Sequence, residues 1–440
     1  MRIGLIIIGH RDYPNEVGAR MAALAAESLR GGGVEVVMQA RACVEPWEAG
    51  EAARNLAAEG VDGVIIFLGT WIEAPVAVAA IREVEHLPLL LWGFPMYEED
   101  GRRESTGSSV AYAVVKAALD RAGRPYKGLL GAVDDEGALQ QALSFCRAAH
   151  AAGRLKRTRL GLVGYASMGM YSATFDHVLL RFLIGPEVEQ ADSYSIFRRA
   201  ESFERKECLA VIERLRQMAF IAPEVNEEEL LTAARLYLAL KSWAEERRLD
   251  AVCVKCQYEF SQEYGMVACV PLSLLAEDGV VTACEGDVLL TVSMAILHYL
   301  TEQAIYYGDA LDYVRNKVYL SSCGFVPYSL ADPADEAFIR PTAHPGFKGI
   351  LNSFPLKPGR VTFLRLAEGR GDYFFTYGTG AGLPSTRRQG WAPAIDVQLD
   401  GDVNVFIEKL TTQHYPLAYG DLSAEIEDLA WIVGIPACRI

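Results

Sequence analysis

The sequence lacks the signals of several protein classes. No stretch approaches the roughly 20 consecutive apolar residues of a transmembrane helix, and no long run of Lys or Arg is present. A formal net charge of −15 argues against binding to nucleic acid or to an anionic membrane surface. The apolar run near the start, residues 3–8, is shorter than the roughly 7–15 residues of a secretory signal core. It therefore predicts a buried strand of a cytoplasmic protein.

Cysteine is present but shows no disulfide framework. The nine cysteines are odd in number and scattered through apolar stretches, which predicts reduced core residues. The "CVKC" stretch, Cys253–Cys256, has the spacing of a redox or zinc pair. In a strand, however, residues three apart point to opposite faces, so packing in the core is the favoured interpretation.

Nucleotide and nucleophile motifs are also missing. Gly161, Gly164 and Gly169 are spaced by three and five residues, which does not fit G-x-G-x-x-G. The sequence contains neither a P-loop nor a G-x-S-x-G elbow. These absences weaken assignment as a dehydrogenase, a kinase or a hydrolase.

What is present is the pattern of an α/β protein. Through residues 1–155, continuous apolar strands alternate with amphipathic helices, as in a parallel sheet covered on both faces. After a basic break, residues 156–300 repeat this alternation, and residues 301–440 change to strands with Gly-rich turns. We expect two consecutive doubly wound parallel-sheet domains, Rossmann- or flavodoxin-like, followed by a mostly antiparallel β-barrel domain.

Three polar residues stand out against this background. In "VTACEGD", Glu285 ends an apolar strand, and Asp309 ends the next expected strand, "AIYYGD". A strand–helix–strand crossover would bring the two carboxylates together, and crowded carboxylates call for a cation. His414 lies in an expected polar turn, in "HYPLAYGD". Oxygen ligands with one imidazole suit Mn²⁺, or alternatively Mg²⁺ or Co²⁺.

Other interpretations of these residues remain open. Asp287 is expected mainly as the N-cap of the helix that follows. Glu259 also ends a strand and competes with Glu285 as a ligand, and His344 is an alternative to His414. His298 and His177 are expected to pack in or near the core.

Two segments resemble a known family. "TACEGDVLLTVSMAILHYLTEQAIYYGD" is similar to the metal region of the L-fucose isomerase and L-arabinose isomerase superfamily, with its Glu and Asp 24 residues apart. "HYPLAYGD" is similar to the late histidine segment of that superfamily. The resemblance implies a Mn²⁺-dependent aldose–ketose isomerase in which Glu285, Asp309 and His414 hold the metal. It also implies that Glu285 and Asp309 are the acid/base pair of a reaction through a cis-enediol.

The resemblance extends to substrate and assembly. It implies sugar contacts from His10, Arg11, Gln257 and Lys255, and from Trp71 in a neighbouring subunit. The implied assembly is a homo-oligomer, a trimer or a hexamer. The "QYEF" and "CEGD" stretches differ from the family pattern, which leaves the sugar open: a 6-deoxy sugar, a pentose, or an anionic sugar such as a sulfonated hexose.

Two other functions compete with isomerisation. Two consecutive α/β units are also typical of periplasmic-type sugar-binding and sensor proteins, although such proteins do not need a third domain. A metal-dependent aldolase or epimerase would use the same enediolate chemistry. Metal dependence and product analysis separate these three possibilities.

Overall fold

The computed structural model describes residues 1–342, 344–384 and 392–440 of the 440-residue chain. Contacts divide the chain into two compact units, Met1–Gly153 and Arg154–Ile440. The predicted separation of residues 156–300 from residues 301–440 stays a prediction.

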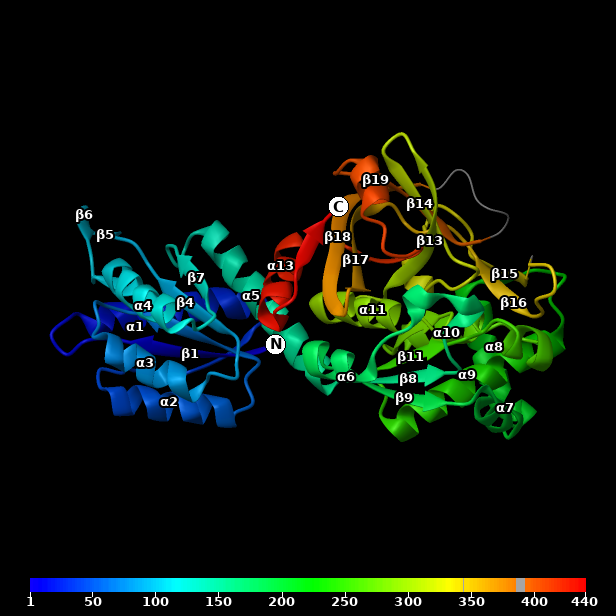
Figure 1. Ribbon diagram of the computed structural model, residues 1–440, viewed down its shortest axis with the longest axis horizontal. Coiled ribbons are helices and arrows are strands. Elements are labelled where there is room, and N and C mark those ends of the chain that lie inside the picture. The colour runs from blue at the N-terminus through cyan, green and yellow to red at the C-terminus, as the bar shows by residue number, and fades with distance from the viewer. Residues whose placement is uncertain (343, 385–391) are drawn as a thin grey trace. The chain divides into compact units, whose positions relative to one another are not determined.

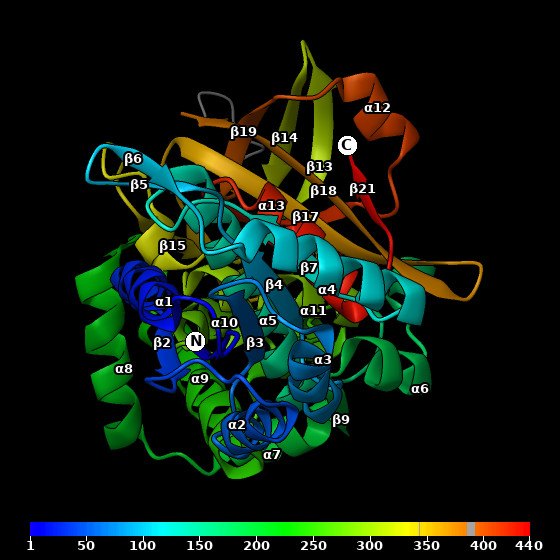
Figure 2. The ribbon, with the colours of Figure 1, turned by 90° about the vertical axis from the view of Figure 1, so that its left-hand side faces the viewer.

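The first unit is built on a five-stranded parallel sheet with the order β2-β1-β3-β4-β7. Its central strands are buried along almost their whole length because helices cover both faces of the sheet. The β5–β6 hairpin extends away from the sheet in both views (Figures 1 and 2). The elements are β1 Arg2–Ile8, α1 Asn15–Gly31, β2 Glu35–Met38, α2 Pro46–Ala58, β3 Gly63–Leu68, α3 Ala74–Glu83, β4 Leu89–Gly93, β5 Tyr97–Glu99, β6 Arg102–Glu104, α4 Ser108–Ala122, β7 Lys127–Leu130 and α5 Glu136–Arg157, whose last four residues belong to the second unit.

The second unit begins with another parallel sheet, of order β12-β11-β8-β9. The carboxyl ends of these strands lead into the loops that carry polar residues of the expected site. The elements of this part are β8 Arg159–Val163, η1 Ser167–Gly169, η2 Tyr171–Ala173, α6 His177–Leu179, η3 Leu180–Ile184, β9 Glu187–Ala191, α7 Ser193–Glu201, α8 Arg205–Met218, α9 Glu227–Arg247, β11 Ala251–Val254, η4 Glu259–Tyr264, α10 Cys269–Glu277, β12 Val281–Cys284 and α11 Val288–Thr301.

A closed antiparallel barrel completes the second unit. Six strands follow one another in the order β17-β20-β13-β14-β19-β18, and β18 pairs back to β17. The short strand β21 pairs with β18 in parallel, and a separate small sheet has the order β10-β15-β16. The elements are β10 Phe220–Ile221, β13 Tyr306–Val314, β14 Lys317–Ser321, η5 Tyr328–Leu330, β15 Phe338–Pro341, β16 Ile350–Ser353, β17 Gly359–Gly369, β18 Asp372–Leu383, β19 Ala394–Leu399, α12 Val403–Glu408, β20 His414–Tyr419, α13 Ser423–Val433 and β21 Ala437–Arg439.

Helix α11 lies between the parallel sheet and the barrel (Figure 1). It packs against β11 and β12 on one side and against β17 and β20 on the other. This position explains why the helix is buried around almost its whole circumference and has little amphipathic character. The N-terminus of α11 is therefore enclosed by both layers of the unit.

The expectation of parallel sheets followed by an antiparallel barrel is confirmed. Two local expectations are wrong. Strand β13 does not end at Asp309 but continues to Val314, and it belongs to the barrel rather than to the sheet of β12. His414 lies in a strand, as the first residue of β20, and not in a polar turn.

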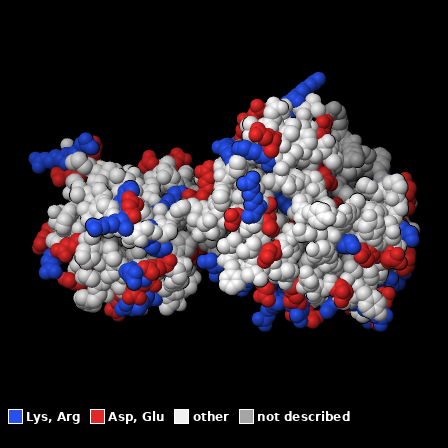
Figure 3. Space-filling view, viewed as in Figure 1, with Lys and Arg blue, Asp and Glu red and all other residues white. Residues whose placement is uncertain are grey.

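Acidic and basic side chains are interspersed on the face displayed in Figure 3. On this face the charged side chains do not gather into a basic stripe of the kind that nucleic-acid-binding proteins carry. Among the described residues, no helix combines the length and the apolar character needed to cross a membrane.

Candidate active site

Asp309 and His414 meet because their strands pair. The antiparallel register of β13 and β20 places the two residues directly opposite each other. Directly opposed side chains in an antiparallel pair lie about 5 Å apart at Cβ. The His414 ring is buried, and its Nε2 lies 3.4 Å from Asp309 Oδ1. The barrel therefore supplies two of the three residues singled out in the sequence.

Glu285 reaches the same point from the parallel sheet. It follows β12 with a φ of 67°, a left-handed conformation that is costly for a residue other than glycine. The backbone N–H of Ser167 donates to the Glu285 carbonyl over 2.9 Å, which helps to hold this conformation. Glu285 Oε2 lies 3.4 Å from His414 Nε2. The strained turn thus aims the carboxylate at the barrel.

Together, Glu285, Asp309 and His414 form one cluster. One ligand atom from each residue lies within 4.8 Å of the other two. Two carboxylate oxygens and an imidazole nitrogen in this arrangement are a suitable donor set for a hard or borderline divalent cation. Their roles as metal ligands belong to the proposal below.

Behind the imidazole lies a buried ion pair. Asp287 Oδ2 is 2.9 Å from His414 Nδ1, and Asp287 Oδ1 accepts from Arg365 Nη2 over 3.0 Å. Asp287 also caps α11, since its side chain accepts from the backbone N–H of Leu290 over 2.9 Å. The expected N-cap is confirmed, but the same carboxylate also orients the histidine, which directs Nε2 toward the cluster. Arg365, from β17, was not singled out in the sequence.

Burial and neighbouring charges shift the pKa values of these groups. Burial raises the pKa of Asp309 to about 6, with Glu285 adding to the rise and His414 opposing it. Burial also acts to raise the pKa of Asp287, but Arg365 and His414 outweigh it and lower that pKa to about 2. Burial lowers the pKa of His414, yet its contacts with Asp287 and Glu285 raise it to about 10. The cluster is therefore a largely enclosed set of charges in which each group shifts the pKa values of its neighbours.

The remaining polar candidates of the second unit lie at the end of β11. Gln257 is buried, and its Oε1 accepts from Ser167 Oγ over 2.5 Å. Because Ser167 also bonds Glu285, Gln257 belongs to the surroundings of the cluster. Lys255 pairs with Glu259 over 2.8 Å, which engages Glu259 outside the cluster.

The candidates of the first unit group around one aromatic set. The ring centroids of His10 and Trp71 are 5.3 Å apart, and Tyr13 stacks on Trp71 at 5.8 Å. Arg11 is exposed and pairs with Glu45 over 2.8 Å. His10, Arg11 and Trp71 thus lie near the carboxyl ends of β1 and β3, where parallel sheets bind ligands.

The other histidines of the second unit are placed elsewhere. His298 Nδ1 contacts the carbonyl of Gln303 at 2.8 Å, and His177 packs on Phe175 with ring centroids 4.4 Å apart. His344 is exposed and lies against Phe347. His414 is therefore the histidine that the second unit brings to the two carboxylates.

Several cysteine thiol groups lie close to Glu285. All nine cysteines are free, and Cys253 and Cys256 are both buried, as expected for core residues. Cys256 Sγ lies 3.0 Å from Cys284 Sγ, and Cys323 Sγ lies 3.8 Å from Glu285 Oε1. Burial acts to raise the pKa of the Cys323 thiol, which keeps it protonated beside the carboxylate.

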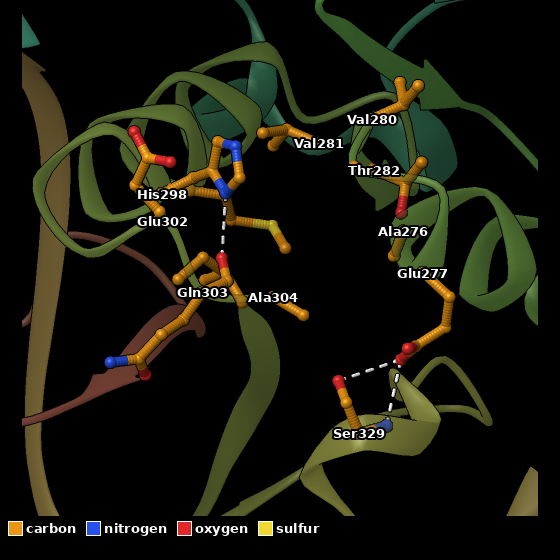
Figure 4. A pocket seen from close by; sticks show the side chains of 13 residues that line it. Ala276, Glu277, Val280, Val281, Thr282, His298, Glu302, Gln303, Ala304 and Ser329 are labelled. Atoms are coloured by element: carbon orange, nitrogen blue, oxygen red, sulfur yellow. Dashed lines mark hydrogen bonds between the residues drawn. The ribbon is translucent and has the colours of Figure 1, made fainter.

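A separate pocket lies at the opposite end of β12 (Figure 4). It has a volume of about 210 Å³, and its walls include His298, Gln303, Glu277 and Ser329. Figure 4 shows Glu277 hydrogen-bonded to Ser329 and His298 to Gln303. The pocket borders the start of β12, whereas Glu285 follows its end, so the two sites are distinct.

Gly286 is the residue on which the position of Glu285 depends. Its φ is +65°, and a Cβ there would lie 2.0 Å from the Tyr165 carbonyl oxygen. We expect Gly286→Ala to lower the free energy of unfolding by more than about 1 kcal/mol and, by displacing Glu285, to reduce the affinity of the metal site proposed below. Gly279→Ala is the matched control, because Gly279 has a φ of +86° but open space around its Cβ position. Equal effects of both substitutions in urea unfolding and metal titration would show that the contact with Tyr165 is unimportant.

Comparison with known proteins identifies the class. No family model matches the chain. The chain is 27% identical over 367 residues to the sulfoquinovose isomerase of Alkalicoccus urumqiensis, covering 80% of this chain and 81% of that protein. It is 24% identical over 439 residues to the sulfoquinovose isomerase of Priestia aryabhattai, covering 97% and 96%. A third sulfoquinovose isomerase, from Clostridium sp. (strain MSTE9), is 25% identical, covering 81% of each chain.

The solved structures that match the chain are only weakly similar to it. A periplasmic solute-binding protein from Actinobacillus succinogenes with bound D-allose is 10% identical, covering 69% of this chain and 92% of that chain, with a TM-score of 0.19. The trehalose repressor from Escherichia coli is also 10% identical, covering 69% and 95%, with a TM-score of 0.17. These scores are too low to support an argument about fold or function.

The isomerase relatives cover between 80% and 97% of the chain. The protein is an enzyme that acts as a sugar isomerase of the aldose–ketose class. The expected resemblance to the L-fucose isomerase superfamily itself stays a prediction.

Proposed function

We propose that this enzyme interconverts a sulfonated aldose of the sulfoquinovose kind and its 2-ketose through a cis-enediol. The observation that supports the reaction is the convergence of Glu285, Asp309 and His414 on one point. The proposal for the substrate is supported by three relatives named for sulfoquinovose, a sugar that carries a sulfonate group.

Glu285, Asp309 and His414 would hold Mn²⁺, with Mg²⁺ and Co²⁺ as alternatives. The donor set fits such an ion, because two carboxylate oxygens and one imidazole nitrogen lie within 4.8 Å of one another, and the cation would replace the proton that His414 carries between the two acids. The contact from His414 Nδ1 to Asp287 leaves Nε2 as the nitrogen that faces the two acids. When bound, the cation supplies electrostatic stabilisation of the negative charge that develops on O1 and O2 of the sugar.

The two carboxylates would also transfer the protons. One takes the proton from C2 of the aldose and returns it to C1, while the other moves the hydroxyl proton from O2 to O1. The sugar gains and loses no atoms in this exchange. Asp309 is suited to such a role by position, because its carboxylate faces His414 Nε2 together with that of Glu285. Glu285 is the second member of the pair.

Substrate contacts and assembly follow the resemblance noted in the sequence. Gln257 and Lys255 would contact the sugar from the end of β11, which leads to the same region as Glu285. His10, Arg11 and Trp71 would contact it from the first unit, with Trp71 completing the pocket of a neighbouring subunit. The proposed assembly is a homo-oligomer, a trimer or a hexamer.

A sugar panel with controlled metal content tests the proposal. Incubation with a chelator, followed by desalting, is expected to reduce isomerisation by at least about 100-fold, since the cation stabilises the developing charge. Added Mn²⁺ should restore turnover of a sulfonated hexose, which NMR detects as the ketose product. In D₂O, the ketose should carry deuterium at C1, whereas an epimerase or an aldolase would give other products. Full activity after metal removal, verified by elemental analysis, would contradict the proposed role of the cluster.

A further inference from the structure

Arg365 is buried, and two of its hydrogen-bond donors lack an acceptor in the described part of the chain. Its side chain is 1% exposed, and Nη2 donates to Asp287 Oδ1 over 3.0 Å and to the Ser172 carbonyl over 3.2 Å. Nε and Nη1 have no acceptor among the described residues. Leaving a buried donor unpaired costs about 1–3 kcal/mol, and more when the group is charged. An acceptor other than the described protein atoms is therefore expected at this guanidinium.

A small cavity adjoins Arg365. Its volume is about 180 Å³, well above the roughly 10–15 Å³ that a single water requires. Ser172 and Thr411 line it with hydroxyl groups, and Leu289 places it at the first turn of α11. Thr411 Oγ1 is also buried without a hydrogen-bond partner among the described residues. The cavity thus brings together three groups that can bind an anion. They are the Arg365 guanidinium, the Thr411 hydroxyl group and the N-terminus of the 14-residue helix α11.

These groups determine the kind of ligand. A guanidinium has only donors, so it selects an acceptor and excludes another cation. Hydroxyl groups and a helix N-terminus also favour negative charge. Two acids oppose it: Asp287, which occupies Nη2, and Glu368, an exposed residue that lines the cavity. A small oxyanion would satisfy Nε, Nη1 and Thr411, and its affinity would be limited by Glu368.

We propose that the cavity beside Arg365, Ser172 and Thr411 is a binding site for a small oxyanion such as sulfate, phosphate or a sulfonate group. The same ligand chemistry has two possible sources: a free inorganic anion, or the anionic end of a sugar substrate. The second source rests on the proposed sulfonated substrate, whereas the first does not. In both cases the oxyanion contacts the guanidinium that holds Asp287 against His414.

Sulfate titration of the metal-loaded, full-length protein tests the site directly. Isothermal titration calorimetry at constant ionic strength is expected to show saturable binding of sulfate. Glu368→Gln removes a like charge from the cavity wall and should tighten binding by about fivefold or more. Thr411→Val removes a hydroxyl group with little change of shape and should weaken binding several-fold. Glu408→Gln, at an exposed carboxylate outside the cavity, is the matched control and should leave the affinity unchanged.

The possible results are decisive. Absence of saturable binding, or equal affinity in the wild type, Glu368→Gln and Thr411→Val, would overturn the proposal and assign the cavity to water. Glu368 is exposed, so Glu368→Gln is expected to fold even if Thr411→Val does not. In that case, the direction in which Glu368→Gln changes the sulfate affinity is sufficient to decide whether the cavity binds an oxyanion.

Steady-state kinetics distinguish the two sources. If the substrate sulfonate occupies the site, sulfate competes with the sulfonated sugar, and Glu368→Gln lowers its KM without changing the KM of the uncharged parent sugar. If a free anion occupies it, sulfate binds equally well with and without saturating sugar. Lack of turnover of sulfonated sugars would contradict the proposed substrate but would leave the calorimetric result intact, so the two failures are distinguishable.

Discussion

Glu285→Gln is expected to abolish isomerisation while preserving the fold. Glutamine has nearly the same shape as glutamate but cannot act as a base, and its amide is a weaker ligand for a divalent cation. Loss of a positioned acid/base group typically lowers the rate by about 10²–10⁴-fold, and weaker metal binding adds to this loss. The rate of ketose formation and the metal content per chain are the quantities to measure.

A matched substitution separates chemistry from general charge effects. Glu263→Gln makes the same change at an exposed position of the second unit and should retain wild-type turnover and metal content. Circular dichroism of Glu285→Gln should match that of the wild type. Normal turnover in a folded Glu285→Gln variant would remove Glu285 from the reaction and return Glu259 to consideration as the functional carboxylate.

Much of the architecture could be predicted because buried parallel strands have a distinctive pattern. The strand Arg2–Ile8 is almost entirely apolar, and Gly63–Leu68 is fully buried, as a sheet covered on both faces requires. The later change to strands with Gly-rich turns likewise predicted the barrel. Strand pairing in that barrel could not be predicted, because register depends on contacts distant in sequence.

The residues of the site likewise divide into those placed by local sequence and those placed by the pairing of distant strands. Glu285 follows the end of a strand and Asp287 caps α11, and both features are local in sequence. The meeting of Asp309 and His414 depends instead on the register of β13 and β20. The sequence predicts a polar turn at His414 because the pairing that makes β20 a strand is distant in sequence, and this pairing buries the residue in the barrel.

Arg365 shows why a residue that contacts the cluster only through another side chain is difficult to predict from the sequence. It lies in the middle of β17 at a position that is otherwise apolar in pattern, "TFLRL". An arginine in a strand ordinarily faces solvent, and only the three-dimensional structure shows that this one is buried against Asp287. A charged residue that interrupts an apolar strand was the available signal for a functional position.

Asp287→Asn is expected to destabilise the second unit and to weaken cation binding at the proposed metal site. Asparagine is as good an N-cap as aspartate, so the substitution isolates the negative charge that pairs with Arg365 and orients His414. Removing one partner of a buried ion pair costs about 3–5 kcal/mol, and loss of the carboxylate behind a ligating histidine lowers metal affinity or activity by about 10–100-fold. Urea unfolding and metal titration measure the two effects.

The difference in unfolding free energy between the wild type and Asp287→Asn should depend on pH, because the pKa of Asp287 is lowered in the folded state. Arg365 and His414 lower that pKa from 3.8 to about 2, so the folded state favours the ionised carboxylate by roughly 2–3 kcal/mol. This stabilisation is complete above about pH 4 and is lost as the pH falls through about 2. The stability gap between the wild type and Asp287→Asn should therefore narrow below pH 4.

Asp402→Asn is the matched control for Asp287→Asn, because Asp402 also caps a helix but is exposed. Its replacement should change the free energy of unfolding by only a few tenths of a kcal/mol, since either side chain accepts the capping hydrogen bond. If Asp287→Asn were equally mild, and metal affinity were unchanged, then Asp287 would act as a helix cap alone. A large effect of Asp287→Asn with none of Asp402→Asn would instead attribute the loss to the buried charge, which connects the barrel arginine to the imidazole of the cluster.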